Sequence, residues 1–339
     1  MVIAITGAAG MLGSRLVDRL GADGHHVRGV DLRPENGVTH VGDVRDARLL
    51  DRAFAGATVV IHCAAALPSY PADQIRSVTV EGTRAVFAAA ERAAVARVVH
   101  VSSTAVYGLP TRVPTPEEHP HAPVDTYSAA KAAAEEIAVR HRAGSLPVAV
   151  LRPKTFLGPG RMGLFSMLFE WAEEGRNFPV LGRGDVRIQM FAVDDLVDAV
   201  VTVLHAPDEV ANDTYNLAAE RFGTLREDFQ AVLDAAGHGR RVVSLPARPA
   251  LAALSLLERS RLSPVYGRLL HKLMADSYVS IDKARQRLGF QPKLSNQDAI
   301  LRTFEWWRTE RHRERPARDG RTSRDPWRQG ALAAAKIFF

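Results

Sequence analysis

Tyr127 and Lys131 form a Y-x-x-x-K pair, a combination of residue types that can transfer a proton. The spacing places both side chains on one face of a helix that we expect to begin near Thr126. A free phenol has a pKa of about 10, and a nearby ammonium group favours its ionised form. Tyr127 is therefore a candidate acid/base that exchanges a proton with a substrate hydroxyl.

A glycine-rich loop precedes this pair by about half a nucleotide-binding domain, at Thr6-Gly7-Ala8-Ala9-Gly10-Met11-Leu12-Gly13. Its glycines permit a tight turn and let a pyrophosphate approach backbone N–H groups at a helix N-terminus. Asp31 follows Gly13 by 18 residues, where a carboxylate accepts hydrogen bonds from ribose hydroxyls and repels a 2′-phosphate. Arg33 is suited to a 2′-phosphate, but the strand-end position of Asp31 favours NAD. The two motifs together predict dehydrogenase-type chemistry on bound NAD.

The first half of the chain alternates between apolar strand patterns and helices. Continuous Val, Ile and Ala runs separated by helices predict an α/β fold with a doubly wound parallel sheet covered on both faces. The expected strands are 2–6, 27–31, 38–42, 58–61, 96–102 and 147–151. The expected helices end near Ala22, follow Asp46, and cover 75–94 and 126–141.

After Arg152 the pattern becomes irregular, which predicts a smaller C-terminal substrate-binding lobe. We assign residues 1–153 and about 190–218 to the NAD-binding domain, and 154–189 with about 219–307 to the lobe. Two stretches, 185–193 and 213–216, resemble strands that return to the sheet. The apolar segment 249–257 is expected to be core or a lid, rather than a membrane contact.

The formal charge of +6 belongs mainly to the C-terminal end, because residues 308–339 hold nine Lys/Arg and four Asp/Glu. That composition is typical of a disordered basic tail. The rest of the chain is nearly neutral, which argues against a nucleic-acid enzyme. One cysteine, Cys63, excludes an internal disulfide and fits a reducing, cytoplasmic location. We see no signal peptide, membrane span or metal-ligand framework.

Many motifs, in this order, resemble the extended short-chain dehydrogenase/reductase family in its NAD-dependent epimerase/dehydratase branch, from Met1 to about residue 310. The resemblance implies a Rossmann-type sheet. It is carried by the loop at 6–13, Gly42-Asp43-Val44-Arg45-Asp46, His62-Cys63-Ala64-Ala65-Ala66, Ser102-Ser103-Thr104-Ala105-Val106-Tyr107-Gly108, Tyr127–Lys131, Leu151-Arg152-Pro153, Gly158-Pro159-Gly160, Val193-Asp194-Asp195 and Leu288-Gly289-Phe290-Gln291-Pro292.

The resemblance also implies roles for particular residues. Lys131 would bind the nicotinamide ribose as well as assist Tyr127, and Ser103 would hydrogen-bond the reacting oxygen. Family members commonly dimerise through the helices at 75–94 and 126–141, so we expect a homodimer. The cofactor residues would be Gly7, Gly10, Met11, Leu12, Gly13, Asp31, Leu32, Arg33, Asp43, Val44, Ala64, Ala65, Ala66, Ser102, Tyr127, Lys131 and Pro153, and the substrate residues Ser103, Thr104, Tyr127, Thr155 and Arg187.

Departures from the family pattern narrow the chemistry. Sugar 4,6-dehydratases place Asp-Glu where this chain has Thr104 and Ala105, so that kind of dehydration is disfavoured. Sugar-nucleotide epimerases often carry Asn at the position of Thr155, which weakens the nucleotide-sugar interpretation. Arg187 is either a ligand for a substrate diphosphate or a surface arginine.

Three functions follow from these features. The first is an NAD-dependent nucleotide-sugar epimerase that oxidises a carbinol transiently, with Tyr127 as acid/base. The second is a net dehydrogenase or reductase of a hydrophobic, sterol-like or flavanol-like alcohol. The third is an NAD-binding regulator without turnover, which the Tyr127/Lys131 pair makes the weakest of the three.

Overall fold

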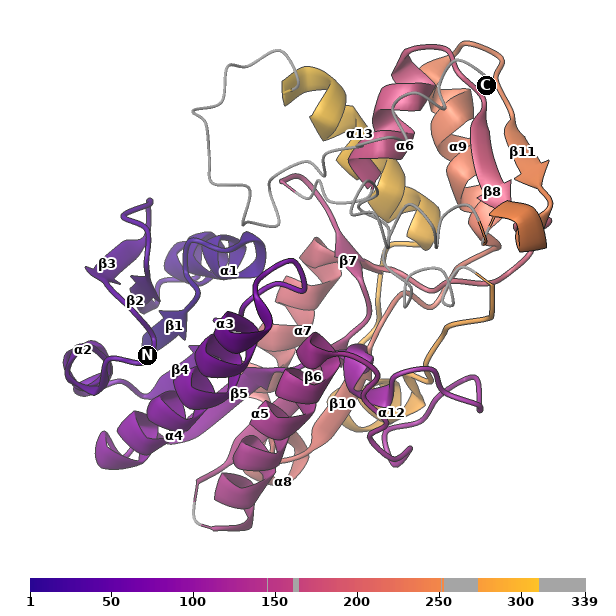
Figure 1. Cartoon of the computed structure of the whole chain (residues 1–339). Coiled ribbons are helices and arrows are strands. Elements are labelled where there is room, and N and C mark those ends of the chain that lie inside the picture. The colour runs from indigo at the N-terminus through magenta and orange to yellow at the C-terminus, as the bar shows by residue number, and fades with distance from the viewer. Residues whose placement is uncertain (145, 161–164, 251, 253–273, 311–339) are drawn as a thin grey trace.

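A parallel sheet of seven strands forms the larger lobe of the protein (Figure 1). The structure is a computed structural model that describes residues 1–144, 146–160, 165–250, 252 and 274–310. In spatial order the strands are β10 (Thr214–Leu217), β6 (Val148–Pro153), β5 (Arg97–Val101), β4 (Val59–His62), β1 (Val2–Thr6), β2 (His26–Asp31) and β3 (Val38–Val41).

The strand order reverses beside β1, which lies between β2 and β4 in parallel register. In open α/β sheets, ligands bind at such a switch point, outside the carboxyl ends of the strands. The glycine-rich loop leaves β1 at this point, so the topology puts the predicted cofactor loop where the fold binds ligands. The predicted doubly wound α/β fold is confirmed.

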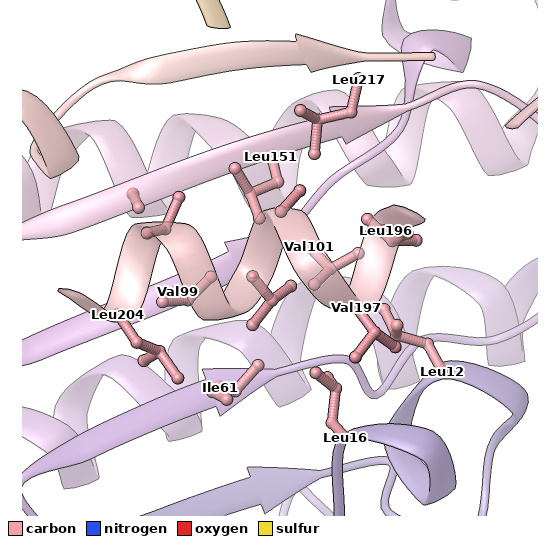
Figure 2. Close-up of a cluster of buried hydrophobic side chains, with 14 of the residues drawn as sticks. Leu12, Leu16, Ile61, Val99, Val101, Leu151, Leu196, Val197, Leu204 and Leu217 are labelled. Atoms are coloured by element: carbon pink, nitrogen blue, oxygen red, sulfur yellow. The ribbon is translucent and has the colours of Figure 1, made fainter. Parts of the chain in front are cut away.

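Helices cover both faces of the sheet and bury its apolar side chains. On one face, α1 (Met11–Ala22) and α7 (Val193–His205) contribute Leu12, Leu16, Leu196 and Val197, which meet strand residues such as Ile61 (Figure 2). The other face is covered by α2 (Ala47–Phe54), α4 (Gly82–Arg92) and α5 (Thr126–Ala143). Burial on both sides explains why central strands such as β1 and β4 are almost continuously apolar.

The helix expected at 75–94 is in fact three joined segments. They are α3 (Ala72–Arg76), a π-helical turn η1 (Ser77–Glu81) and α4. A π-turn inside a helix often marks a functional site, because it redirects side chains that an unbroken α-helix would place elsewhere. The buried residue of η1 is Thr79, whose contacts are described below.

The smaller lobe packs around its own apolar core (Figure 1). Aromatic side chains such as Trp171, Phe229 and Phe304 fill this core. Its elements are α6 (Phe165–Glu173), β8 (Phe178–Leu181), α9 (Leu225–Ala236), β11 (Val242–Leu245) and α13 (Asn296–Glu310). We propose the same two lobes that were expected from the sequence, except that one segment moves from the smaller lobe to the larger. Helix α12 (Asp282–Leu288) and Phe290 pack on the sheet core and not in this lobe.

Of the two stretches expected to return to the sheet, only one does. Residues 214–217 form β10 beside β6. The expectation for 185–193 is wrong: only Phe191–Ala192 forms a strand, β9, which pairs with β7 (Phe156–Leu157), while Ile188 bridges to Ser277. The backbone groups of 187–191 bond to residues 155, 219, 276, 277 and 296 and not to the seven-stranded sheet.

The structure describes only part of two further segments that were predicted from the sequence. Helix α13 runs through Glu310, so the first residues of the predicted disordered tail are helical. The remainder of that tail, 311–339, and most of the segment 249–257 lie outside the described residues. Among the residues that are described, no helix has the length and apolarity needed to cross a membrane.

Candidate active site

The glycine-rich loop is packed so tightly that Gly7 and Gly13 leave no room for a side chain. Gly7 has φ +72°, and a Cβ there would lie 2.8 Å from the backbone N of Ala64. A Cβ on Gly13 would lie 2.1 Å from the Gly7 carbonyl oxygen. Gly10 is the N-cap of α1 and offers no side chain to its free N–H groups. The loop therefore fits a pyrophosphate, which would accept hydrogen bonds from the backbone N–H groups at the start of α1.

Asp31 ends β2 and points its carboxylate at this loop. It accepts hydrogen bonds from the backbone N–H of Ala9, at 3.0 Å, and of Arg33, at 3.1 Å. The Arg33 guanidinium is also engaged, because it donates to the Ala9 carbonyl at 2.9 Å and pairs with Glu35 at 3.1 Å. Leu32 between them is 63% exposed. Both groups therefore lie beside the loop, but the charge of Arg33 is balanced by Glu35 and by Asp31, which is 3.7 Å from its Nε, and this arrangement fits NAD.

The other predicted cofactor residues lie around the same end of the sheet. Asp43 pairs with Arg45, whose guanidinium holds the pKa of the Asp43 carboxyl below its usual range. Val44 is buried under Gly82, where an added Cβ would meet Val44 at 2.7 Å. The loop after β4 holds Ala64, Ala65 and Ala66, and Ala64 lies directly against Gly7.

Helix α5 positions the predicted acid/base. Asp125 caps its N-terminus by accepting from the backbone N–H of Ser128 at 2.7 Å, and the Ser128 hydroxyl oxygen accepts from the N–H of Asp125. This capping box starts the helix at Thr126, so Tyr127 lies in its first turn. A helix N-terminus favours negative charge, which supports the ionised phenol that a base requires. Tyr127 packs against the small apolar cluster formed by Ala66, Ile75 and Ala130.

Lys131 lies one turn further along α5, and it is almost fully buried. Its Nζ donates to the carbonyl oxygen of Val101, at the end of β5, at 2.7 Å. Burial lowers the pKa of Lys131 to about 8, although the carboxylate of Glu135 acts in the opposite direction. The lysine is thereby held at the end of β5, next to Ser102 and Ser103.

Glu135, which the sequence analysis missed, lies one turn beyond Lys131. Its carboxylate accepts from the Ser102 hydroxyl at 2.6 Å and from the Arg152 Nε at 2.9 Å. Burial alone would raise its pKa, but hydrogen bonds from His121, Arg152 and Ser102 hold the pKa of Glu135 well below its usual range. The continued i, i+4 spacing, Y-x-x-x-K-x-x-x-E, is the signal that could have found it.

Arg152 extends this buried network across three strands. Its guanidinium donates to the Tyr107 hydroxyl at 2.6 Å, and that hydroxyl donates to Asn216 Oδ1 on β10 at 2.8 Å. The carboxylate of Glu135 in this network raises the pKa of Lys131, one turn away on α5, against the effect of burial. A buried charge is costly unless it is paired, and here each charged group has a partner.

The predicted substrate residues fall into two groups. Ser103 and Thr104 begin the 3-10 turn η2 (Thr104–Tyr107), next to Lys131, and the Thr104 hydroxyl donates to the carbonyl oxygen of the buried Pro153 at 3.4 Å. Thr155 and Arg187 are exposed and lie towards the smaller lobe. Arg187 pairs with Asp276 at 3.3 Å and covers the Tyr278 ring, with its guanidinium carbon 4.7 Å from the centroid.

Comparison with known proteins identifies the class of this site. The model of the NAD dependent epimerase/dehydratase family matches residues 3–218. The chain therefore belongs to this family, and it is an NAD-dependent enzyme.

Particular relatives agree with this assignment. UDP-glucose 4-epimerase of Mycolicibacterium smegmatis is 32% identical over 336 residues, covering 90% of this chain and 97% of the relative. Uncharacterized protein y4nG of Sinorhizobium fredii is 34% identical, covering 91% and 78%. The crystal structure of the Bordetella bronchiseptica enzyme WbmG in complex with NAD matches with a TM-score of 0.73 at 25% identity, covering 91% and 94%.

Proposed function

We propose that this protein is a nucleotide-sugar epimerase that uses NAD without net consumption and Tyr127 as its acid/base. The observation that carries the proposal is the arrangement at the end of β5, where Lys131 is buried against the Val101 carbonyl one turn from Tyr127. The similarity to UDP-glucose 4-epimerase over nearly the whole length of that relative supports it. Thr104 and Ala105 offer no acid or base for sugar dehydration.

The residues of the chain divide the chemistry as follows. Bound NAD would supply a two-electron acceptor that takes a hydride from a substrate carbon and can return it. Tyr127 removes the hydroxyl proton during oxidation and returns it during reduction. The positive charge of Lys131 lowers the cost of the phenolate, and Ser103 orients the reacting oxygen. The configuration at the oxidised carbon is then inverted if the keto intermediate turns its other face to the cofactor before the hydride returns.

Arg187 is the proposed ligand for the substrate diphosphate. Asp276 and Tyr278 hold its guanidinium in place, and the Tyr278 hydroxyl accepts from it at 2.6 Å. A guanidinium that is already oriented loses less freedom when it binds phosphate oxygens. The exposed position leaves the remaining donors open to a ligand entering from the smaller lobe.

The test is a panel of UDP-, dTDP- and GDP-sugars added to the NAD-loaded protein. We expect at least one to raise the melting temperature and to be converted to its epimer without accumulation of NADH. Arg187→Ala should abolish the thermal shift, whereas Arg183→Ala, at an 87% exposed side chain four residues earlier, should preserve it. Stoichiometric NADH formation from apolar secondary alcohols, with no sugar nucleotide bound, would instead establish the dehydrogenase.

A further inference from the structure

A buried histidine, His62, joins the cofactor loop to helix α4. It ends β4, and its Nδ1 lies 2.7 Å from the hydroxyl of Thr6, the residue directly before Gly7. Its Nε2 lies 3.0 Å from the hydroxyl of Thr83 on α4. All three side chains are at most 1% exposed, so water cannot replace either contact.

The hydroxyl of Thr83 determines which way the protons point. It donates to the Thr79 carbonyl oxygen at 2.6 Å, so its single proton is used. Its contact with His62 must therefore be a hydrogen bond donated by Nε2–H. In a neutral imidazole the other nitrogen then accepts, which makes Nδ1 the acceptor for the Thr6 hydroxyl. The chain of bonds requires one neutral tautomer of His62.

This chain ends in the backbone of the loop that follows β4. The Thr6 hydroxyl oxygen accepts from the N–H of Ala64 at 3.4 Å, and the Thr79 hydroxyl oxygen accepts from the N–H of Ala66 at 3.3 Å. Ala64 is also the residue against which Gly7 packs. His62 thus lies between the glycine-rich loop, the 64–66 loop and the π-turn η1.

We propose that His62 is a positioning residue for NAD, which it serves by holding the glycine-rich loop against the 64–66 loop through its neutral Nε2–H tautomer. The proposal rests on the NAD site of this family and not on the identity of the substrate. The burial that lowers the pKa of His62 to about 3 keeps the ring neutral at physiological pH. Nδ1 therefore remains able to accept from Thr6.

The neighbouring strand supplies a matched control. His100 on β5 lies opposite His62 in the parallel register, with ring centroids 5.3 Å apart, and it is equally buried. Neither ring nitrogen of His100 has a hydrogen-bond partner within the part of the chain that the structure describes. Replacing His100 therefore removes packing alone, whereas replacing His62 removes packing and two oriented hydrogen bonds.

The first measurement is the NAD dissociation constant by calorimetry, without any sugar nucleotide. We expect His62→Phe to weaken NAD binding about tenfold more than His100→Phe does, from the loss of buried hydrogen bonds. His62→Asn, whose amide can occupy the Nδ1 position and accept from Thr6, should recover part of the loss. Equal dissociation constants for the His62→Phe and His100→Phe proteins would overturn the proposal.

The second measurement does not depend on whether the variants fold. Nitrogen-15 NMR of the histidine rings of the unmodified protein should show His62 as the neutral Nε2–H tautomer, with and without NAD. The opposite tautomer, or an even mixture of both, would overturn the proposal. Neither measurement involves catalysis, so failure of the epimerase proposal would leave this result standing.

Discussion

Three side chains of α5, spaced one turn apart, make up the proposed catalytic face. Tyr127 lies in the first turn, Lys131 reaches the carbonyl end of β5, and Glu135 binds Arg152 and Ser102 beneath them. The ammonium and the helix N-terminus both favour a phenolate at Tyr127. Glu135 balances the buried cations, so the charge of Lys131 is retained close to the tyrosine.

The first prediction concerns Tyr127. Tyr127→Phe removes the oxygen of the proposed acid/base but keeps the ring that packs against the cluster of Ala66, Ile75 and Ala130, so NAD binding should be unchanged. Turnover should fall by roughly 10²–10⁴-fold, the usual effect of losing a general base. Steady-state kinetics measures the loss, and calorimetry with NAD is the control. A variant with near-normal kcat would remove Tyr127 from the mechanism.

A second prediction at this scale is a preference for NAD over NADP. Asp31 presents its carboxylate to the loop, while Arg33 is held by the Ala9 carbonyl and Glu35. The unmodified protein should bind NADH more tightly than NADPH, and Asp31→Ala should narrow the difference by about tenfold, the effect of one charge-assisted hydrogen bond. Calorimetric titration with NADH and with NADPH measures this preference. Tighter NADPH binding by the unmodified protein would contradict it and would identify Arg33 as a ligand of the 2′-phosphate.

At the scale of elements, short connections between helices and strands hold the site together. The capping box starts α5 at a defined residue, and the π-turn η1 places Thr79 against the 64–66 loop. In the smaller lobe, Asp228 of α9 and Asn296 of α13 make an equivalent buried connection at 2.8 Å. Asn296 also donates to the Ile188 carbonyl at 2.8 Å, next to Arg187.

Asp228 carries a prediction on the pH dependence of stability. Burial raises its pKa to about 6, and its Oδ1 has no hydrogen-bond partner among the described residues. Because the pKa of Asp228 is higher in the folded than in the unfolded protein, protonation of this carboxyl stabilises the native state. The stabilisation is fully present below the unfolded pKa of about 4 and is lost as the pH rises through the folded pKa of about 6. The free energy of unfolding therefore falls by roughly 3 kcal/mol between these two pH values.

Asp228→Asn removes the titrating group at nearly constant shape. Urea denaturation between pH 4 and pH 7 should therefore show the variant gaining stability relative to the unmodified protein as the pH rises. Comparing the two proteins at each pH cancels the contribution of every other titrating group. A stability difference that stays constant over this range would contradict the assigned pKa.

At the scale of the whole molecule, α4 and α5 pack beside each other on one face of the sheet (Figure 1). Both are rich in alanine, which permits close approach of a second pair of helices. Val139 on α5 is 42% exposed, an apolar side chain on this outer surface. We therefore propose that two copies of the chain associate through these helices.

Light scattering at micromolar concentration should give about twice the 37.0 kDa mass of one chain. Val139→Glu should shift the mass towards that of a monomer, because it places a charge in the proposed interface. Leu109→Glu is a suitable control, since Leu109 is 44% exposed but lies outside both helices. A monomer mass for the unmodified protein would refute the homodimer.

Features that depend on local spacing could be predicted from the amino-acid sequence alone. The parallel α/β sheet, the glycine-rich loop, Asp31 at the end of β2 and the Tyr127/Lys131 pair were all predicted from it. Helical period and the steric demands of a tight turn act over a few residues, so they can be read along the chain. The comparisons with known proteins confirm the family and the use of NAD.

Contacts between groups that are far apart in the sequence could be found only from the folded protein. Thr6 and His62 are 56 residues apart, and Tyr107 and Asn216 are 109 apart, yet each pair shares a buried hydrogen bond. The segment 185–193 has a strand-like sequence, but its backbone hydrogen bonds go to residues outside the large sheet, such as 155, 277 and 296. Sequence patterns indicate that a strand will form or that a polar group will be buried. Which hydrogen-bond partner each group finds depends on how the whole chain satisfies its buried donors and acceptors.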